Sequence, residues 1–447
     1  MLLFLPAAQI ATPNPTPPPA APARGQDPGQ APAQAFDLAG ALARARAENA
    51  QLKGAKAKVE ERQALITSTR ADALPQLAVT ADYTRLRDDS LLMGGTGQLL
   101  TSLGMTPNQV AAPYSLYVTQ ATLSQPLFYW GKLGTAVRVA EMGEREAGYA
   151  YTTAELDTLH GVAVAYIAVL SAQAELEVIQ TRLQTAERFL HDVEARLEAQ
   201  TATELDRLRA QSEYLGVLPD NLQAQAAYQR AVEQLNGQLA LDPRTPLQLR
   251  DPGTPELAAL APLVPVERSE VAQYKQQEQM YRANDQIIKS DLRPKLDFNA
   301  AYGYQTGASS DLFKEPYDTW KVNLSLRVPL FDGMRTSGKR AQNRAQLEQV
   351  LEARVDLERN LAVEQSTAER ELRKAVAFQD AAQAAHTAAL EALRTSREAF
   401  DQGLITSLDL LTAERTERQQ ESQRKRAELA IWSALFDYRR ACGLAPL

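Results

Sequence analysis

The sequence predicts an α+β membrane protein with an internal tandem duplication, in which very long helices are joined to four β-strands per chain. Three observations predict this fold. A junction between a strand and a helix occurs twice, as Pro126-Leu127-Phe128-Tyr129-Trp130-Gly131 and as Pro329-Leu330-Phe331-Asp332-Gly333. Segments in which apolar and polar residues alternate, with the period of a β-strand, precede each junction. A run of helix formers follows each junction and is longer than an ordinary globular domain contains.

The composition fits long helices better than compact mixed cores. Charged residues make up 23% of the 447 residues, whereas aromatic residues make up only 6%. The formal net charge of −7 gives no indication of nucleic-acid binding. The single cysteine, Cys442, excludes an internal disulfide framework, and its position excludes an acylated N-terminal cysteine.

Residues 1–35 form a region of their own. Met1–Ile10 is apolar, but the segment is short, contains Pro6 and has no preceding Lys or Arg. It predicts either a signal segment whose start is missing or a disordered start. Ala11–Gln34 is rich in proline and alanine and cannot bury a core. No run approaches the roughly 20 apolar residues of a transmembrane helix, so membrane contact would come through β-strands or an interfacial helix, or would not occur at all.

Residues 36–243 make the first repeat. Asp37 is a candidate N-cap of a helix to about Ala73, which Pro75 ends. Two strands follow at Gln76–Leu86 and Tyr114–Leu127, and a glycine-containing loop over 87–113 separates them. The segment Gly131–Gln200 contains no proline, and a helix of this length would be roughly 105 Å long. The chain breaks at Thr201-Ala202-Thr203 and continues as a helix to about Leu241.

Residues 268–447 repeat this order after a proline-rich linker over 244–267. The sequence predicts a helix at Ser269–Asp291 and two strands at Lys295–Tyr304 and Trp320–Leu330. A long helix that breaks near Gly403 follows, and a last helix runs to about Cys442. The two copies keep their register. Leu205-Asp206 matches Leu408-Asp409 at an offset of 203 positions (408 − 205 = 203), the same offset that relates Leu127 to Leu330.

The residue patterns of the strands and of the helices indicate what each of them contacts. Alternating segments of about ten residues with Tyr and Trp at the ends are typical of transmembrane β-strands, while a half-buried soluble sheet is the other interpretation. The polar side of the last strand, with Lys321, Asn323, Ser325 and Arg327, suits water. Four strands cannot close a barrel, and lipid does not tolerate an open edge, so three copies in a cyclic oligomer would supply twelve strands. Alanine-rich helical stripes such as 381–385 suit long helix–helix seams.

The chain resembles the TolC-type outer-membrane efflux proteins. The duplicated junction, the helix break before each Leu-Asp pair, the segment Gly403–Glu414 and the C-terminal motif Leu435–Gly443 carry the resemblance, which covers about Phe36 to Gly443. It implies a homotrimer with a twelve-stranded β-barrel in the cell outer membrane and a long α-helical coiled-coil tunnel in the periplasm. It also implies a passive exit duct that docks onto a periplasmic adaptor protein and an inner-membrane transporter, in efflux or type I secretion. The alternative is a structural trimeric coiled-coil stalk without channel activity.

The resemblance places candidate gate residues at the two helical tips. It implies that carboxylates there ring the narrowest aperture and favour cations, which points to Asp206 and Asp409. Thr412 stands where some members carry a second Asp, and Phe400 and Ile405 occupy the places of a Tyr and an Arg that lock the tip in some members. The alternative is that each Asp caps the helix that returns from the tip. The candidate adaptor-contact residues are Thr201, Ala202, Thr203, Leu404, Ile405, Thr406 and Ser407. The alternative is that these residues form only a turn between two helices.

Aromatic residues near the strand ends suggest the membrane boundary. Tyr129, Trp130 and Trp320 suit an aromatic girdle, although packing at the junction is an alternative for Tyr129 and Trp130. Gly131 and Gly333 would permit the turn from strand to helix.

No motif in the sequence predicts catalysis. The three histidines, His160, His191 and His386, lack metal-ligand spacing, and we expect them on helix surfaces or in seams. No P-loop, dinucleotide-binding or nucleophile motif occurs. We therefore expect no enzyme, no cofactor and no metal site, and the energy for transport would come from a partner.

Overall fold

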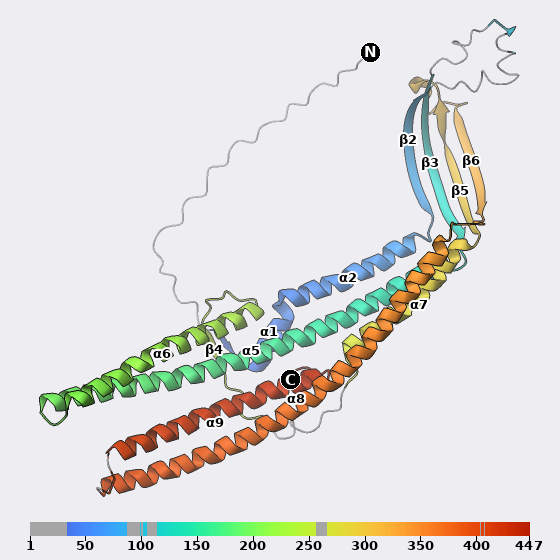
Figure 1. The fold of residues 1–447 in the computed structure, drawn as a ribbon. Helices are drawn as coiled ribbons and strands as arrows, with labels where there is room; N and C mark the ends of the chain where they lie inside the picture. Colours follow the sequence, from blue (N-terminus) through green and yellow to red (C-terminus); the bar gives the residue numbers. More distant parts are fainter. Residues whose placement is uncertain are drawn as a thin grey trace, which may run out of the picture.

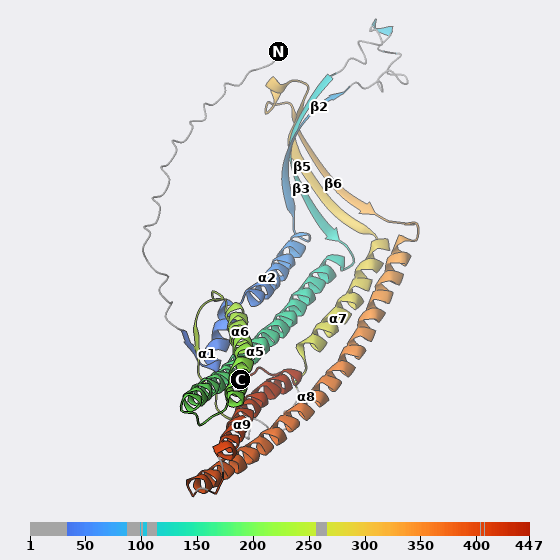
Figure 2. The same ribbon diagram turned by 60° about the vertical axis from the view of Figure 1, so that its left-hand side comes forward.

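The computed structural model describes residues 34–86, 99, 102–104, 114–255, 266–402, 404–405 and 407–447. The expectations for the segment before Gln34, for most of the 87–113 loop, for linker residues 256–265 and for Gly403 and Thr406 lie outside these residues. The described chain is elongated, with a β-sheet at one end and long helices that run away from it (Figure 1). Figure 2 shows the same separation of sheet and helices from a second direction.

Four antiparallel strands form the sheet, in the order β2 (Gln76–Leu86), β3 (Tyr114–Phe128), β5 (Lys295–Thr306) and β6 (Asp318–Arg327). Each repeat supplies one hairpin, and β3 pairs with β5 to join the two. A short 3-10 helix, η4 (Ser309–Asp311), lies in the connection between β5 and β6. β6 ends three residues before the predicted Leu330. The ladder stops at the pair of Lys295 and Arg327, and Pro329 has no N–H with which to continue it.

The four long helices have the same lengths in both repeats. α5 (Lys132–Glu198) and α8 (Arg335–Asp401) each span 67 residues, and α6 (Glu204–Gln238) and α9 (Ser407–Ala441) each span 35. Every start and end is displaced by 203 positions, for example from Lys132 to Arg335 (335 − 132 = 203). The predicted duplication is therefore confirmed. In Figure 1, α5 and α6 form one hairpin and α8 and α9 form another, and both tips lie far from the sheet.

The single helix that we predicted from Asp37 to about Ala73 is wrong, because the chain forms two helices, α1 (Leu38–Glu48) and α2 (Ala50–Ala71). They meet at Asn49, whose backbone is extended. The Asn49 Oδ1 accepts hydrogen bonds from the N–H groups of Gln51 and Leu52 at 2.9 and 3.4 Å. Its Nδ2 donates to the Gln238 carbonyl at 3.0 Å. One side chain therefore caps the start of α2 and the end of α6.

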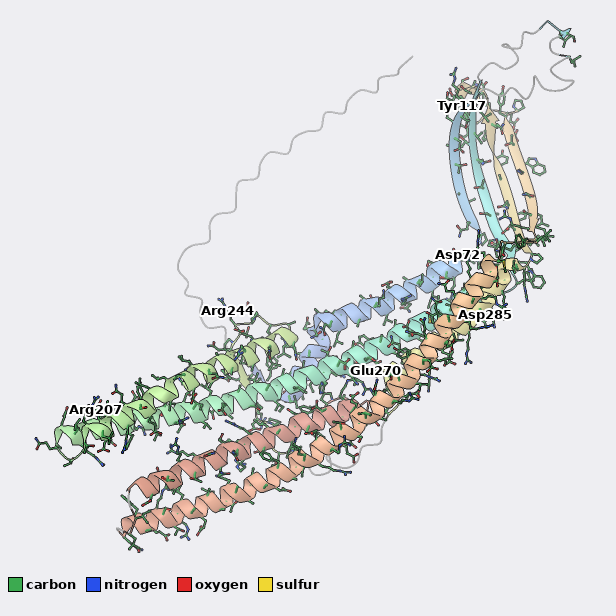
Figure 3. The ribbon with its side chains drawn as sticks, in the orientation of Figure 1. Asp72, Tyr117, Arg207, Arg244, Glu270 and Asp285 are labelled. Carbon is green, nitrogen blue, oxygen red and sulfur yellow. The ribbon has the colours of Figure 1, made fainter. Side chains whose placement is uncertain are left out.

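Arg268 precedes α7 (Ser269–Lys289), the helix that continues into the 3-10 helix η3 (Ser290–Leu292), and its side chain caps the end of α9 but not the start of α7. Its nearly buried guanidinium donates to the carbonyls of Arg440 and Ala441 at 3.1 and 3.3 Å. It also pairs with Glu270 at 2.6 Å, and Glu270 pairs with Arg440 at 2.9 Å. Figure 3 labels Glu270 where α7 leaves the middle of the molecule. Burial alone would raise the pKa of Glu270, but the hydrogen bonds from Arg268 and Arg440 outweigh burial and lower its pKa to about 2.

The main hydrophobic core lies in the middle of the helical part, where the two repeats meet. α1, α5, α6 and α9 contribute to it, and Tyr166, Leu235 and Phe436 are completely buried there. The Tyr166 hydroxyl lies 3.0 Å from the Phe36 carbonyl and 2.6 Å from the Arg250 carbonyl. These contacts tie the core to a parallel strand pair, β1 (Gln34–Phe36) and β4 (Leu247–Leu249). The predicted tail and linker therefore contribute two ordered strands that sequence reasoning missed.

Within the described residues, α5 is the one helix that is long and apolar enough to cross a membrane, judged by length and composition alone. This finding corrects our prediction that no such run exists. An 18-residue window of α5 is as apolar on average as a membrane span. Apolar side chains of α5 between Leu159 and Leu170 pack into the core. Only 28% of the most apolar window of α5 is buried within the single chain, so core packing accounts for part of its apolar character.

Candidate functional site

The strand register sorts the sheet into an apolar face and a polar face. Facing pairs such as Leu77–Leu123 and Phe298–Leu324 place apolar side chains on one side. Successive residues of a strand point to opposite sides, so the intervening residues, such as Thr80, Gln120, Asn299 and Asn323, lie on the polar face. The apolar side chains are exposed in the single chain, by 74% for Leu77 and 62% for Leu324. An apolar surface of this extent indicates contact with lipid or with another protein.

Aromatic side chains gather at the end of the apolar face that lies away from the helices, where Figure 3 labels Tyr117. The rings of Tyr83 and Tyr117 are 5.0 Å apart, and those of Tyr302 and Tyr304 are 6.2 Å apart. Trp320 faces Tyr302 in the ladder and is 74% exposed. Sequence reasoning named Trp320 alone at this end. The four tyrosines occupy strand positions on the same face as the apolar residues, and this alternation could have identified them as part of the aromatic group.

A second aromatic group, Phe128 and Trp130, lies at the end of the sheet next to the helices, with ring centres 5.0 Å apart. Tyr117 and Phe128 are 11 positions apart on β3, or about 36 Å along the strand. At a strand tilt of about 40°, this length spans about 28 Å along the barrel axis, close to the roughly 25 Å apolar band of outer-membrane barrels. A girdle at each end of the band stays a prediction for Trp130 and Trp320.

The polar face carries Asp82, Asp297, Lys321 and Arg327 among neutral polar residues. Gly303 lies on this face where β3 and β5 approach closely. A Cβ atom at Gly303 would lie 2.1 Å from the Thr119 carbonyl oxygen, so no larger residue fits without moving the backbone. The polar side chains of this face are suited to a water-filled interior rather than to lipid.

The sheet is open at both sides. In the part of the chain that the structure describes, β2 pairs only with β3, and β6 pairs only with β5. One edge of each outer strand therefore has backbone N–H and C=O groups without a strand partner. Such edges are not stable in lipid unless another chain pairs with them.

The first junction turns the chain with a bulge and two residues in the left-handed region. Leu127 is the extra residue between the paired Pro126 and Phe128, and the bulge places Phe128 opposite Leu296 on the apolar face. Trp130 and Gly131 then have φ values of 53° and 75°, and α5 begins at the next residue. The Trp130 Nε1 donates to the Pro294 carbonyl at 2.8 Å.

Tyr129 lies on the opposite side of this junction from Trp130. Its hydroxyl donates to Oδ1 of Asp297 at 2.6 Å, and Asp297 belongs to the polar face. The Lys295 ammonium lies 5.9 Å from the centre of the Tyr129 ring. These contacts correspond to junction packing, the alternative that the sequence left open for Tyr129.

The second junction uses the same two left-handed positions with different residues. Gly333 and Met334 have φ values of 65° and 64°, and α8 begins at Arg335. At the offset of 203, Gly131 therefore corresponds to Met334 (131 + 203 = 334) rather than to Gly333. Met334 is the N-cap residue of α8, and the Asp332 carboxylate accepts a hydrogen bond at 2.8 Å from the Thr336 N–H in the first turn of the helix. The side chains of the shared Pro-Leu-Phe motif protrude here, because Leu330 is 92% exposed and Phe331 is 81% exposed.

A capping box closes the tip between α5 and α6, beside Arg207 in Figure 3. Thr203 is the N-cap residue of α6. Its hydroxyl accepts a hydrogen bond from the Asp206 N–H at 3.3 Å, and the Asp206 carboxylate accepts one from the Thr203 N–H at 3.0 Å. The hydrogen bond from the Thr203 hydroxyl is the largest cause that lowers the pKa of Asp206, and the backbone hydrogen bond follows. Asp206 thus completes a cap as the third residue of the helix rather than as the N-cap itself.

The second tip is described at Leu404, Ile405 and Ser407. The Leu404 N–H donates to the Ala399 carbonyl at 2.8 Å, and the Leu404 side chain is 71% exposed. Asp409 lies exposed in the first turn of α9, at the position that corresponds to Asp206 in the first tip. Both carboxylates therefore lie at equivalent places in two equal hairpins. A gate at these positions and an adaptor contact at Thr201, Ala202 and the second tip stay predictions.

A cavity of about 760 Å³ lies between the two hairpins near the tips and is lined by α5, α6 and α9. Two of the predicted gate residues border the cavity, Asp206 from the first tip and Thr412 from the second. Ion pairs bridge the hairpins across it, between Arg426 and Glu175 and between Arg415 and Glu213 at 3.7 Å. Arg418 also donates to the Thr185 hydroxyl at 3.2 Å. Sequence reasoning missed this polar link because its partners are more than 200 positions apart.

In the described ranges, no cluster of three His, Cys, Asp or Glu side chains could hold a metal ion. Two histidines pair with carboxylates of α9 instead. His160 on α5 lies 2.7 Å from Asp437, and His386 on α8 lies 3.3 Å from Glu417. These pairs connect neighbouring helices.

Comparisons with known proteins agree with this geometry. The family model described as "Outer membrane efflux protein" matches residues 41–240 and 262–443. The chain is 28% identical to the pyoverdine export outer membrane protein OpmQ of Pseudomonas aeruginosa over 327 residues, which are 71% of this chain and 66% of OpmQ. It is 26% identical to the outer membrane protein TolC of Vibrio cholerae over 400 residues, 85% of this chain and 84% of that protein. The crystal structure of the Campylobacter jejuni CmeC outer membrane channel superposes with a TM-score of 0.76 at 14% identity, over 91% of this chain and 85% of CmeC.

Proposed function

The chain belongs to the outer membrane efflux protein family, and we propose on that premise that it is the exit duct of a tripartite efflux or type I secretion system. Three copies form one passive pore in the cell outer membrane, and their helices extend into the periplasm. One observation carries this proposal: the sheet exposes a continuous apolar face while both of its outer strands lack partners among the described residues.

A trimer resolves both features at once. β6 of one copy pairs with β2 of the next, and the three sheets close into a barrel of twelve strands that leaves no edge in lipid. The apolar face with Leu77, Val322 and Leu324 then meets the lipid. The polar face with Thr80, Asn299 and Asn323 lines a water-filled passage.

The helices continue this wall below the membrane. α5 and α8 are each about 100 Å long, a length that suits a tube across the periplasm. Water lies on both sides of such a wall, so helices, whose backbone groups pair internally, replace strands at the junctions. The Arg426–Glu175 and Arg415–Glu213 pairs hold the two hairpins of one chain together near the tip.

The tips regulate passage and receive the partners. Asp409 contributes one carboxylate per chain to a ring that favours cations, and Asp206 adds a second ring while it also caps α6. A periplasmic adaptor protein contacts the tip residues Thr201, Thr203, Leu404 and Ile405. An inner-membrane transporter supplies the energy, and the duct itself carries out no chemical step.

Fractionation and conductance test this proposal against the structural stalk. We expect the protein in the outer-membrane fraction as a trimer that dissociates only on heating in SDS. The purified trimer should also form channels in planar bilayers. A soluble product that forms no channel would overturn the duct and favour the stalk.

A further inference from the structure

Resting on the proposed duct, we infer that Arg293 and Trp130 form a binding site for the phosphate group of a phospholipid in the leaflet that faces the helices. The site combines the two repeats of one chain. Trp130 belongs to the first junction, and Arg293 lies between η3 and β5 of the second repeat. A trimer would therefore carry three such sites around its barrel.

The aromatic platform is held in place. The Arg293 guanidinium carbon lies 5.1 Å from the centre of the Trp130 ring, within the range of a cation–π contact. The indole N–H donates to the Pro294 carbonyl at 2.8 Å, and the ring edge contacts Phe128. Phe128 faces Leu296 on the apolar face, so the platform continues that face at its lower border.

The Arg293 side chain is available to a ligand. It is exposed, and no carboxylate in the described part of the chain lies within 4 Å of its nitrogens. Among the described residues, the one hydrogen bond that Arg293 makes comes from its backbone N–H, which donates to the Ser290 carbonyl. By contrast, Lys132, Lys295 and Lys339 at the same level all lie within 2.6 to 3.7 Å of Asp291. A guanidinium offers five N–H donors in a planar fork that fits two oxygens of a phosphate.

The surroundings of the site favour a lipid over a soluble anion. Leu292 is 43% exposed beside Arg293, and Leu330, Phe331 and Met334 protrude at the same end of the sheet. Indole rings prefer the level of the headgroups, where one side is apolar and the other is wet. A phospholipid whose phosphate is bound by Arg293 would place its acyl chains along the apolar face. A free phosphate ion has no acyl chains and would gain no binding energy from that face.

Native mass spectrometry of the detergent-purified trimer with added phosphatidylglycerol tests this site. Arg293→Gln should bind phosphatidylglycerol about fivefold more weakly than the wild type, because one basic group near a membrane surface contributes about that factor. The matched control is Arg230→Gln on α6, which removes the same charge from an exposed arginine far from the sheet and should bind normally. Arg293→Lys, which keeps the charge but loses the planar fork, should fall between the wild type and Arg293→Gln.

Two further ligands identify what is bound. Diacylglycerol has the same chains without phosphate and should not distinguish Arg293→Gln from the wild type. Inorganic phosphate at millimolar concentration should not displace phosphatidylglycerol. Equal phosphatidylglycerol binding by the wild type, Arg293→Gln and Arg293→Lys, or displacement by inorganic phosphate, would overturn the inference. If Arg293→Gln does not form trimers, weaker binding by Arg293→Lys than by the wild type decides the question. Conductance of the wild-type trimer in the same preparation tests the proposed duct separately.

Discussion

Replacing Leu324 with lysine should prevent stable insertion of the barrel, whereas lysine at the neighbouring Asn323 should be tolerated. Leu324 lies near the middle of β6 between Trp320 and Leu326, faces Phe298 and is 62% exposed on the apolar face. A lysine at the bilayer midplane on the lipid side of a barrel costs about 2–4 kcal/mol. Each chain of a trimer would carry this cost, which corresponds to roughly one and a half to three orders of magnitude per chain in the insertion equilibrium.

The two variants differ only in the face that receives the charge. Asn323 faces Asn299 on the polar side, where a lysine would remain in water. The assay is the fraction of heat-modifiable trimer in the outer membrane, followed by urea unfolding of the reconstituted protein. We expect Leu324→Lys to lose most of the trimer and Asn323→Lys to retain it. If the two variants behave alike, or if Asn323→Lys is the more damaging, the assignment of the faces is wrong.

Three other predictions concern the tips, the sheet and the ion pair of Glu270 at the start of α7. Asp409→Ala should raise the conductance or weaken the cation preference in planar bilayers. The control is Asp380→Ala, at an exposed position on α8 away from the tip, which should change neither property. Unchanged selectivity of Asp409→Ala would count against a gate at Asp409. Gly303→Ala should lower the dissociation temperature of the trimer, because the new methyl group meets the Thr119 carbonyl at 2.1 Å, at a cost of about 1–3 kcal/mol. Gly307→Ala, with its nearest neighbour at 3.7 Å, should change little, and equal effects would refute this reasoning. The pKa of Glu270 is lowered from 4.5 to about 2, so its contribution to stability is complete above pH 4.5 and is lost as the pH falls toward 2. Glu270→Gln should therefore make the melting temperature depend less on pH in that window than Glu187→Gln does. Parallel profiles of melting temperature against pH for the two variants would contradict the prediction.

The sequence predicts most of this fold because its strongest signals are periodic and occur twice. The alternation in Gln76–Leu86 predicts the bounds of β2, and the proline-free run after Gly131 predicts α5 to within two residues. The break at Asn49 was missed because the apolar period continues across it, and only the tertiary contact with the Gln238 carbonyl shows why an asparagine stands there. The β1–β4 pair was missed for a similar reason, since three-residue strands have no detectable period.

The sites were less predictable than the fold. Asp206 could be placed at a tip from the Leu-Asp repeat, but its reciprocal hydrogen bonds with Thr203 depend on the geometry of the turn. The link between Arg415 and Glu213 joins helices from different repeats, and no local pattern predicts such a pair. Tyr129 and Trp130 are adjacent in the sequence and lie on opposite faces, as alternation predicts, but the bulge at Leu127 reverses which face each of them occupies. Strand alternation alone cannot predict the outcome of a bulge.

The two repeats meet the same physical requirements with different side chains. Both junctions need two consecutive left-handed residues, and the glycine occupies the second position at Gly131 but the first at Gly333. Matching the glycines by eye therefore misaligns the repeats by one residue. The ends of the two returning helices follow the same rule, since the Gln238 carbonyl receives the Asn49 amide, whereas the Ala441 carbonyl, 203 positions later, receives the Arg268 guanidinium. The guanidinium brings a buried charge that the amide does not, and Glu270 neutralises it. The two repeats therefore keep the backbone geometry and differ in the capping side chain, and the charged cap at Arg268 is accompanied by the carboxylate of Glu270.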